Sequence, residues 1–254
     1  MPRASSANVK MDCLTIVDEI EIQKQYYERT AAQYDDMHLS KTDEQYFALS
    51  YLIGSINFHE IRSVLDIGSG TGRVLRELKR NHPGLRVVGI EPVQALREIG
   101  YANGLAETEL VAGDGNALQF ESKEFDLVCA FGVLHHIRHP EITVSEMLRV
   151  AGKAIFISDS NNFGQGSLLS RTIKQAVNFC GLWPLANLIK TKGKGYSVTE
   201  GDGVAYSYSL FNNYRLIRSA CKSVHILNTL DAGINPYRTA PHIALLGIKK
   251  DDDH

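Results

Sequence analysis

The stretch Val64-Leu65-Asp66-Ile67-Gly68-Ser69-Gly70-Thr71-Gly72 decides the fold of this chain. An apolar, partly β-branched run ends in an acid, and glycines then stand at alternate positions. The six residues that follow, Arg73–Leu78, have the pattern of an amphipathic helix. The sequence therefore predicts a strand, a tight turn and the start of a helix, where a ligand can lie directly against main-chain amides.

The glycine spacing separates this turn from two common phosphate-binding motifs. In the dinucleotide fingerprint G-x-G-x-x-G, the third glycine falls at the position that Arg73 holds here, and no Gly-Lys-Ser/Thr of a P-loop follows. Asp66 would repel a pyrophosphate but would attract an ammonium group. The pattern D-x-G-x-G-x-G after an apolar strand resembles motif I of the class I methyltransferases that use S-adenosylmethionine (SAM).

The composition is that of an ordinary globular protein, with 44% hydrophobic and 22% charged residues among 254. The 27 basic and 29 acidic residues give a net charge of −2, so the chain lacks the positive charge expected of a nucleic-acid-binding protein. The cysteines are scattered without the spacing of metal ligands, and no metal is expected. They are Cys13, Cys129, Cys180 and Cys221.

Two segments bear on location. Met1–Met11 contains no apolar core of a secretory signal, and a cytoplasmic setting is expected. Leu168–Ile189 is largely apolar, but it carries charges and is interrupted by Gly181 and Pro184. We therefore expect no membrane span there.

Strand and helix patterns alternate through the middle of the chain, which is typical of a parallel sheet with crossover helices. Two further strand patterns near the C-terminus fit the antiparallel pair that closes a methyltransferase sheet. The expected strands are 64–67, 86–90, 109–112, 125–131, 153–158, 223–229 and 242–248, and the expected core helices are 73–80, 93–101 and 140–150.

The predicted fold is α/β, a Rossmann-like, doubly wound, seven-stranded sheet, mostly parallel with an antiparallel C-terminal strand. N-terminal helices (Leu14–Ala32 and Glu44–Ile56) precede it, and an insertion precedes the last strands. We expect one methyltransferase domain over residues 1–254. Its parts are an N-terminal helical cap (1–60), a cofactor-binding core (61–158), a lid or substrate insertion (159–222) and closing strands (223–250).

Acids follow three successive strands of this predicted sheet: Asp66, Glu91 and Asp114. Ligands of open α/β sheets bind beyond the carboxyl ends of the strands. A carboxylate can accept two hydrogen bonds from the two ribose hydroxyls. The alternative is that these acids only cap helices.

The family resemblance gives each of these residues a role toward SAM. It implies that Glu91 binds the ribose, that Asp114 binds the adenine amine, and that Asp66 orients the methionine ammonium. Glycines allow the backbone to approach, and Phe131 lies beside the methionine portion. The cofactor-binding residues expected in full are Tyr26, Tyr34, Asp66, Gly68, Ser69, Gly70, Gly72, Glu91, Pro92, Asp114, Gly115, Asn116, Phe131 and Gly132.

Residues 26–35, Y-Y-E-R-T-A-A-Q-Y-D, resemble the Y-x-x-x-A-x-x-Y-D element of many small-molecule methyltransferases, which folds over the cofactor. An aromatic ring near a sulfonium gains from cation–π attraction, so Tyr26 or Tyr34 is a candidate contact. The alternative is a tyrosine that packs at a helix interface.

Methyl transfer from a sulfonium is an in-line displacement that needs alignment and a dry pocket, with a base only for a weak nucleophile. His135 and His136 follow the fourth strand in a segment that resembles the family's V-L-H-H, and either is a candidate general base. The alternative is a structural histidine. His38 and His139 are weaker candidates.

Two segments of the insertion bear on the acceptor. The tract 200–210 mixes acids, rings and hydroxyls and could line a pocket for a sugar or a hydroxylated aromatic, or form an edge strand. The stretch 168–189 could be a lid for an apolar acceptor, or could pack in the core. Methyltransferases that act on nucleic acid bases carry D/N-P-P-Y/F after the fourth strand. This chain has Phe131-Gly132-Val133-Leu134 there, which argues against a nucleic acid acceptor.

The sequence thus predicts transfer of the SAM methyl group to oxygen, nitrogen or carbon of a small molecule, either a biosynthetic metabolite or a sugar-containing compound. The product of the donor is S-adenosylhomocysteine (SAH). The alternatives are a non-catalytic scaffold of the same fold and a nicotinamide-dependent oxidoreductase, for which the glycine spacing is wrong. No nucleic acid partner is expected, and the oligomeric state is left open.

Overall fold

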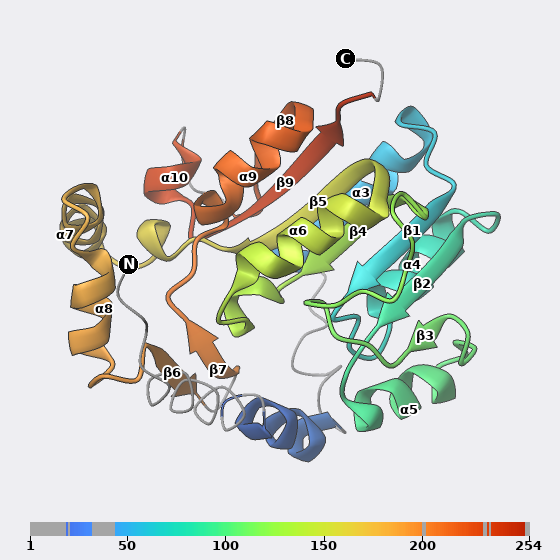
Figure 1. Ribbon diagram of the computed structural model, residues 1–254, viewed down its shortest axis with the longest axis horizontal. Helices are drawn as coiled ribbons and strands as arrows, with labels where there is room; N and C mark the ends of the chain where they lie inside the picture. The colour runs from blue at the N-terminus through green and yellow to red at the C-terminus, as the bar shows by residue number, and fades with distance from the viewer. Residues whose placement is uncertain are drawn as a thin grey trace, which may run out of the picture.

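The computed structural model describes residues 19, 21–31, 44–199, 202–230, 233 and 235–251. Its centre is a seven-stranded sheet in the order β3-β2-β1-β4-β5-β9-β8, accompanied by a two-stranded sheet of β6 and β7 (Figure 1). The predicted contact Tyr34 and part of the predicted helix Leu14–Ala32 lie outside the described residues, whereas residues 21–30 are helical.

The strands are β1 (Ser63–Ile67), β2 (Arg86–Ile90), β3 (Leu110–Val111), β4 (Phe125–Phe131), β5 (Ala151–Ser160), β6 (Tyr196–Thr199), β7 (Gly203–Tyr206), β8 (Cys221–Asn228) and β9 (His242–Lys249). The α-helices are α3 (Glu44–Phe58), α4 (Arg73–Asn81), α5 (Gln94–Ala102), α6 (Pro140–Val150), α7 (Leu168–Phe179), α8 (Trp183–Lys190), α9 (Tyr214–Ala220) and α10 (Pro236–Thr239). Short 3₁₀ helices are η2 (Leu134–His136), η3 (Asn162–Gly164) and η4 (Leu210–Asn213).

The order in which strands are added to the sheet reverses between β1 and β4: β2 and β3 lie on one side of β1, and β4 and β5 lie on the other. β1 pairs in parallel with both β2 and β4, while β3 and β5 extend the sheet outward on either side. β9 runs antiparallel between β5 and β8. Open α/β sheets bind ligands beyond the strand ends at such a reversal. The predicted seven-stranded, doubly wound sheet with an antiparallel C-terminal strand is confirmed.

Both faces of the sheet are apolar, because successive side chains of a strand point to opposite faces and helices cover both. On one face, Leu65 and Val128 pack with α6 and α9. On the other, Val64 and Cys129 pack with α3 and α4. A shift of one residue in the pairing of a central strand would exchange the side chains on its two faces. The apolar pattern of the strand therefore fixes its register. Cys129 is thus a small buried apolar residue, as predicted.

The insertion differs from its predicted form. Residues 168–190, whose apolar stretch is interrupted by Gly181 and Pro184, form two helices, because Gly181 adopts a left-handed φ of 71° and Pro184 stands in the first turn of α8. No residue of α7 or α8 is buried, so these helices do not pack in the core. The chain rejoins the core before residue 222, since Tyr208 and Ile217 belong to its buried cluster.

Beyond the carboxyl ends of the parallel strands lie the β6–β7 hairpin and the helix over residues 21–30 (Figure 1). The latter packs on α5 through Tyr27 and Ala31. These segments leave a space at the reversal point that is bounded by the insertion on one side and the sheet on the other. No helix in the described part of the chain combines the length and the apolar character that a membrane crossing requires.

We predict that Gly72→Ala lowers the free energy of unfolding by at least about 2 kcal/mol. Gly72 has a φ of 74°, and a Cβ there would come within 2.1 Å of Leu105 Cδ1. Gly54→Ala is the matched control, because Gly54 lies within α3 with nothing within 4 Å of its added Cβ. The control should gain about 0.5–1 kcal/mol from helix propensity. Urea unfolding measures both, and equal effects would contradict the prediction.

Candidate active site

A cavity of about 1080 Å³ opens at the reversal between β1 and β4. Its inner wall is the glycine turn after β1, and its outer wall is the β6–β7 hairpin with the loop before it. Residues from the segment after β4 lie between these walls. The predicted site residues that line the cavity are Asp66, Gly68, Ser69, Phe131, Gly132, His135 and His136.

The glycine turn needs left-handed backbone at each of its glycines. Gly68, Gly70 and Gly72 have φ values of 65°, 55° and 74°, a region that is costly for residues with a Cβ. A Cβ at Gly68 would also come within 2.7 Å of Val133 Cγ2. The turn is anchored to the neighbouring strand, because Ser69 N donates to the carbonyl of Ile90 at 2.9 Å. The main chain thus borders the cavity without intervening side chains.

Two buried carboxylates flank this turn. Asp66 is 1% exposed and accepts a hydrogen bond from Ser69 Oγ at 2.6 Å. Glu91 is 5% exposed and accepts from the backbone N–H of Gly70 at 3.0 Å and of Val93 at 2.9 Å. Burial raises the pKa of Asp66 to about 6 and the pKa of Glu91 to about 7. Burial opposes the negative charge of both, so a ligand that donates hydrogen bonds or carries positive charge would stabilise their ionised forms.

Neither acid is itself the N-cap residue of a helix, although Glu91 accepts from the N–H of Val93, which precedes α5. The N-cap residues of α4 and α5 are Gly72 and Val93, and neither helix has a side-chain cap. Asp114 differs, because it is exposed and its Oδ1 accepts from Asn116 N at 2.9 Å in a local turn. That turn is held to α6, since Thr143 Oγ1 donates to Asn116 Oδ1 at 2.7 Å.

The other predicted cofactor contacts in the described residues do not line the cavity; they are Tyr26, Gly70, Gly72, Glu91, Pro92, Asp114, Gly115 and Asn116. Gly115 packs closely, because a Cβ there would come within 2.9 Å of Ile67 Cγ2, whereas Pro92 is exposed. Tyr26 is buried near the start of β7, where a Cβ at Gly203 would come within 3.0 Å of its ring. The neighbouring Tyr27 lines the cavity instead. Tyr26 therefore has the environment of the packed tyrosine that the sequence left as an alternative.

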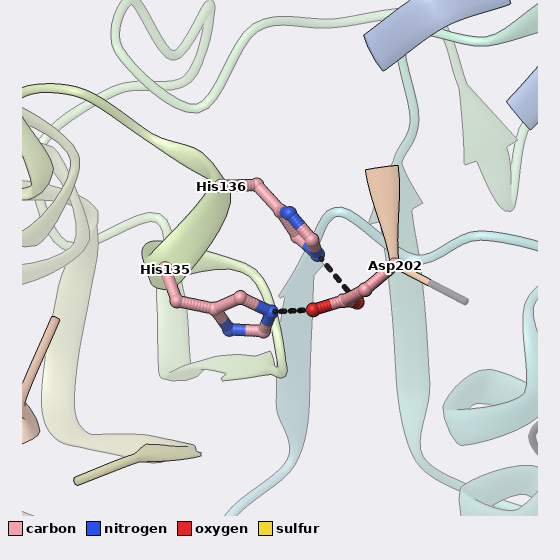
Figure 2. Close-up of side chains that lie close together, drawn as sticks. All are labelled: His135, His136 and Asp202. Atoms are coloured by element: carbon pink, nitrogen blue, oxygen red, sulfur yellow. Dashed lines mark ion pairs between the residues drawn. The ribbon is translucent and has the colours of Figure 1, made fainter. Parts of the chain in front are cut away.

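The histidines of η2 form the other chemical centre of the cavity. His135 Nδ1 lies 2.7 Å from Oδ1 of the buried Asp159, whose Oδ2 also accepts from Leu134 N at 2.8 Å. His136 Nδ1 lies 2.6 Å from the carbonyl oxygen of Val204 in β7. Figure 2 shows both imidazoles pointing toward Asp202, which is 3.3 Å from His135 Nε2 and 3.4 Å from His136 Nε2.

The electrostatics of this cluster bear on the general-base prediction. Burial alone would lower the pKa of His135, but the carboxylates of Asp159 and Asp202 together raise this pKa to about 10. The pKa of Asp202 is lowered, since the two imidazoles outweigh its burial. A protonated imidazole cannot accept a proton. In this arrangement His135 therefore lacks the property that a general base requires, and a group bound at its Nε2 would first have to displace the proton there.

Four residues that line or support the cavity were not predicted individually: Tyr27, Gln45, Asp159 and Asp202. Asp159 stands at the carboxyl end of β5, so the rule that selected Asp66 and Glu91 could have found it. Asp202 lies in the tract 200–210, for which the sequence left a pocket lining or an edge strand open. Residues 203–206 form the strand β7, and residues 202 and 205–208 line the cavity. Gln45 from α3 carries no sequence signal. Its Nε2 lies 3.1 Å from His242 Nε2, a contact that only the fold creates.

The amino-acid sequence matches known methyltransferases over its central part. Residues 65–155 match the family model described as a methyltransferase domain. Over 70 residues the chain is 39% identical to demethylmenaquinone methyltransferase from Thermotoga maritima. That match covers 27% of this chain and 30% of the length of that enzyme.

Solved structures share the fold at low sequence identity. Magnesium protoporphyrin IX methyltransferase from Synechocystis PCC 6803, solved with bound SAH, is 15% identical with a TM-score of 0.57, and the match covers 92% of this chain and 100% of that chain. A SAM-dependent methyltransferase from Thermotoga maritima is 20% identical with a TM-score of 0.54, covering 89% and 99%. These matches agree with the resemblance drawn from motif I: residues 65–155 match a methyltransferase domain, in a fold shared with solved SAM-dependent methyltransferases.

We predict that Glu91→Gln changes the pH dependence of stability of the ligand-free protein. The pKa of Glu91 rises on folding from 4.5 to about 7, so between these values the folded state binds more protons than the unfolded state. Stability is therefore lost as pH rises through this window, by up to about 1.4 kcal/mol per pH unit.

Urea unfolding at pH 5, 6.5 and 8 tests this dependence. The free energy of unfolding of Glu91→Gln, relative to that of the wild type, should increase from pH 5 to pH 8. A pH-independent difference caused by the amide itself does not affect this trend. Glu98→Gln, at an exposed position on α5, should track the wild type at all three pH values. A relative stability of Glu91→Gln that stays constant or decreases would show that burial does not perturb this carboxyl.

Proposed function

We propose that this protein transfers the methyl group of SAM to a small molecule and releases SAH. The observation that carries the proposal is the left-handed glycine turn between two buried carboxylates, at the reversal point of the sheet. The backbone is bare where an adenosine-bearing ligand must approach closely. Burial raises the pKa of both carboxyls, and they accept hydrogen bonds from Ser69, Gly70 and Val93.

Each residue of the turn has a role suited to SAM. The Glu91 carboxylate can accept from both ribose hydroxyls, and Asp66 can bind the ammonium of the methionine portion, directly or through water. Asp114, Gly115 and Asn116 stand past β3, where the resemblance puts the adenine. Bound SAM supplies an activated methyl group on a sulfonium. The protein supplies alignment of the acceptor with the S–CH₃ bond and exclusion of water.

The acceptor side of the cavity is polar. Tyr206, Ser207 and Tyr208 line it together with the histidine–aspartate cluster, and lysines 190, 192 and 194 lie in its wall. A volume of about 1080 Å³ exceeds the usual range for one drug-sized ligand, so a donor and a small acceptor can be bound together. These features support a hydroxylated acceptor, with transfer to oxygen favoured over transfer to nitrogen or carbon.

Two of the three similar proteins act on small molecules, by the names they carry: demethylmenaquinone and magnesium protoporphyrin IX. This supports a small-molecule acceptor here and does not identify it. A nucleic acid acceptor is disfavoured by the net charge of −2 and by Phe131-Gly132-Val133-Leu134 after β4. The cytoplasmic location stays a prediction, which rests on the scattered cysteines.

We predict that SAH raises the melting temperature of the protein and that NAD does not. Glu91→Ala and Asp66→Ala should each weaken SAH binding by about 1–3 kcal/mol, because each leaves donors of the ligand unpaired. Glu98→Ala is the exposed control and should bind like the wild type. Calorimetric titration measures the affinities. Stabilisation by NAD instead of SAH would favour the oxidoreductase alternative.

We further predict that a labelled methyl group from SAM enters the small-molecule fraction of a metabolite extract, and not its protein or nucleic acid fractions. With SAM below saturation, Glu91→Ala should lose most of this transfer while Glu98→Ala keeps it. Scintillation counting of the separated fractions and mass spectrometry of the labelled product give the acceptor. Normal SAH binding without transfer to any fraction would favour a non-catalytic scaffold.

A further inference from the structure

His135, His136 and Asp202 bring two imidazoles and a carboxylate to one point of the cavity wall (Figure 2). One ligand-type atom from each residue can be chosen so that all three lie within 4.8 Å of one another. The two histidines belong to η2, which follows β4 in the chain, whereas Asp202 comes from the insertion and immediately precedes β7. The expectation of no metal rested on cysteine spacing and did not consider these residues.

The hydrogen bonds of the two Nδ1 atoms fix the orientation and the tautomer of each imidazole ring. A carboxylate and a carbonyl oxygen only accept hydrogen bonds. Nδ1 of His135 faces the Asp159 carboxylate at 2.7 Å and Nδ1 of His136 faces the Val204 carbonyl at 2.6 Å, so both Nδ1 atoms carry the hydrogen. Both Nε2 atoms then face Asp202. Metal-binding histidines are held in this way by acceptors behind the ring.

The distances to Asp202 suit a bridging ion better than direct hydrogen bonds. Charge-assisted N–H···O bonds are about 2.7–2.9 Å long, as the His135–Asp159 contact is. The Nε2–carboxylate distances are longer, 3.3 Å for His135 and 3.4 Å for His136. In a tetrahedral site with metal–ligand bonds of about 2.0–2.1 Å, neighbouring ligand atoms are about 3.3 Å apart. Each Nε2 thus lies at such a ligand–ligand distance from one oxygen of the Asp202 carboxylate, Oδ2 for His135 and Oδ1 for His136.

We propose that His135, His136 and Asp202 bind a divalent first-row transition metal ion of the zinc class, with an open coordination position toward the cavity. Two imidazole nitrogens and one carboxylate favour such ions over Mg²⁺ or Ca²⁺, which prefer oxygen ligands. Three protein ligands leave a position for water or for a ligand in the cavity. The Tyr27 hydroxyl, 3.2 Å from His136 Nε2, lies beside the site.

The site also defines a class of acceptor, and this step rests on the proposed function. An acceptor hydroxyl bound at the open position would have a lowered pKa and would release its proton to solvent, as metal-bound water does. Its oxygen then forms the bond to the methyl carbon while the S–CH₃ electron pair returns to sulfur, and neutral SAH leaves. We therefore infer an acceptor with a metal-binding hydroxyl, and histidines that act as ligands rather than as a general base.

The first experiment measures metal binding without SAM or acceptor. Metal-free protein is titrated with Zn²⁺ by calorimetry, and with Co²⁺ by visible absorption. We expect one ion per chain and the intense d–d bands of a four- or five-coordinate site without thiolate charge-transfer bands. Mg²⁺ should not compete. Asp202→Asn should weaken Zn²⁺ binding at least a hundredfold, and His136→Ala similarly.

The controls exclude other metal-binding groups. His139→Ala changes an exposed histidine of the same segment, which pairs with Glu141, and should bind Zn²⁺ like the wild type. Cys180→Ser removes an exposed thiol and should do the same. Asp202 is 44% exposed, so its variant should melt like the metal-free wild type. Absence of stoichiometric binding, binding unchanged in Asp202→Asn, or binding lost in Cys180→Ser would each overturn the proposal.

A second measurement separates this inference from the proposed function. SAH binding is measured on the metal-free protein. We expect it to persist there, because the hydrogen bonds of Asp66 and Glu91 involve none of the three metal ligands. Methyl transfer is then compared with and without Zn²⁺. Methyl transfer at full rate in the metal-free protein would overturn the inferred acceptor class but not the proposed function. Zn²⁺ binding without SAH binding would overturn the proposed function but not the metal site.

Discussion

The hydrogen bond between Gly70 N–H and the buried Glu91 carboxylate is the contact on which the site depends. It joins the turn after β1 to the end of β2, and the second oxygen of Glu91 holds Val93 at the start of α5. The left-handed glycines let the turn adopt this shape, and the parallel pairing of β1 with β2 brings the two strand ends to the same edge. A single carboxyl therefore fixes two loops and one helix around the place where the donor is proposed to bind.

The core of this fold could be predicted because its signals are local. β2, β4 and α6 begin and end where their apolar patterns do, since each is set by residues adjacent in sequence. β3 is shorter than the predicted 109–112, because it is an edge strand that pairs only with β2. β5 is longer, since β9 pairs with it as far as Ser160. The acids Asp66 and Glu91 were found for the same local reason, as each directly ends a strand.

The acceptor side could not be predicted in the same way, because its contacts join segments that are distant in sequence. Asp202 reaches the histidines only because the β6–β7 hairpin folds back over η2, and nothing in the tract around it indicates that approach. The apolar pattern of residues 168–189 left a lid and packing in the core open, and Phe179 and Leu168 prove to be among the most exposed large apolar side chains. Periodicity indicates an amphipathic helix but not which surface, if any, covers its apolar side.

The β6–β7 hairpin is stabilised mainly by contacts with other segments of the chain. A two-stranded sheet is marginally stable alone, and this one is joined to the helix over 21–30, where Gln23 accepts from Val204 N and Glu19 binds Tyr206 and Arg138. That helix in turn rests on α5, beside the donor site. With the donor at the glycine turn and the acceptor at the hairpin, as proposed, this connection would couple the two binding events. Any change that one ligand makes in the affinity of the other would then be reciprocal, by the same factor.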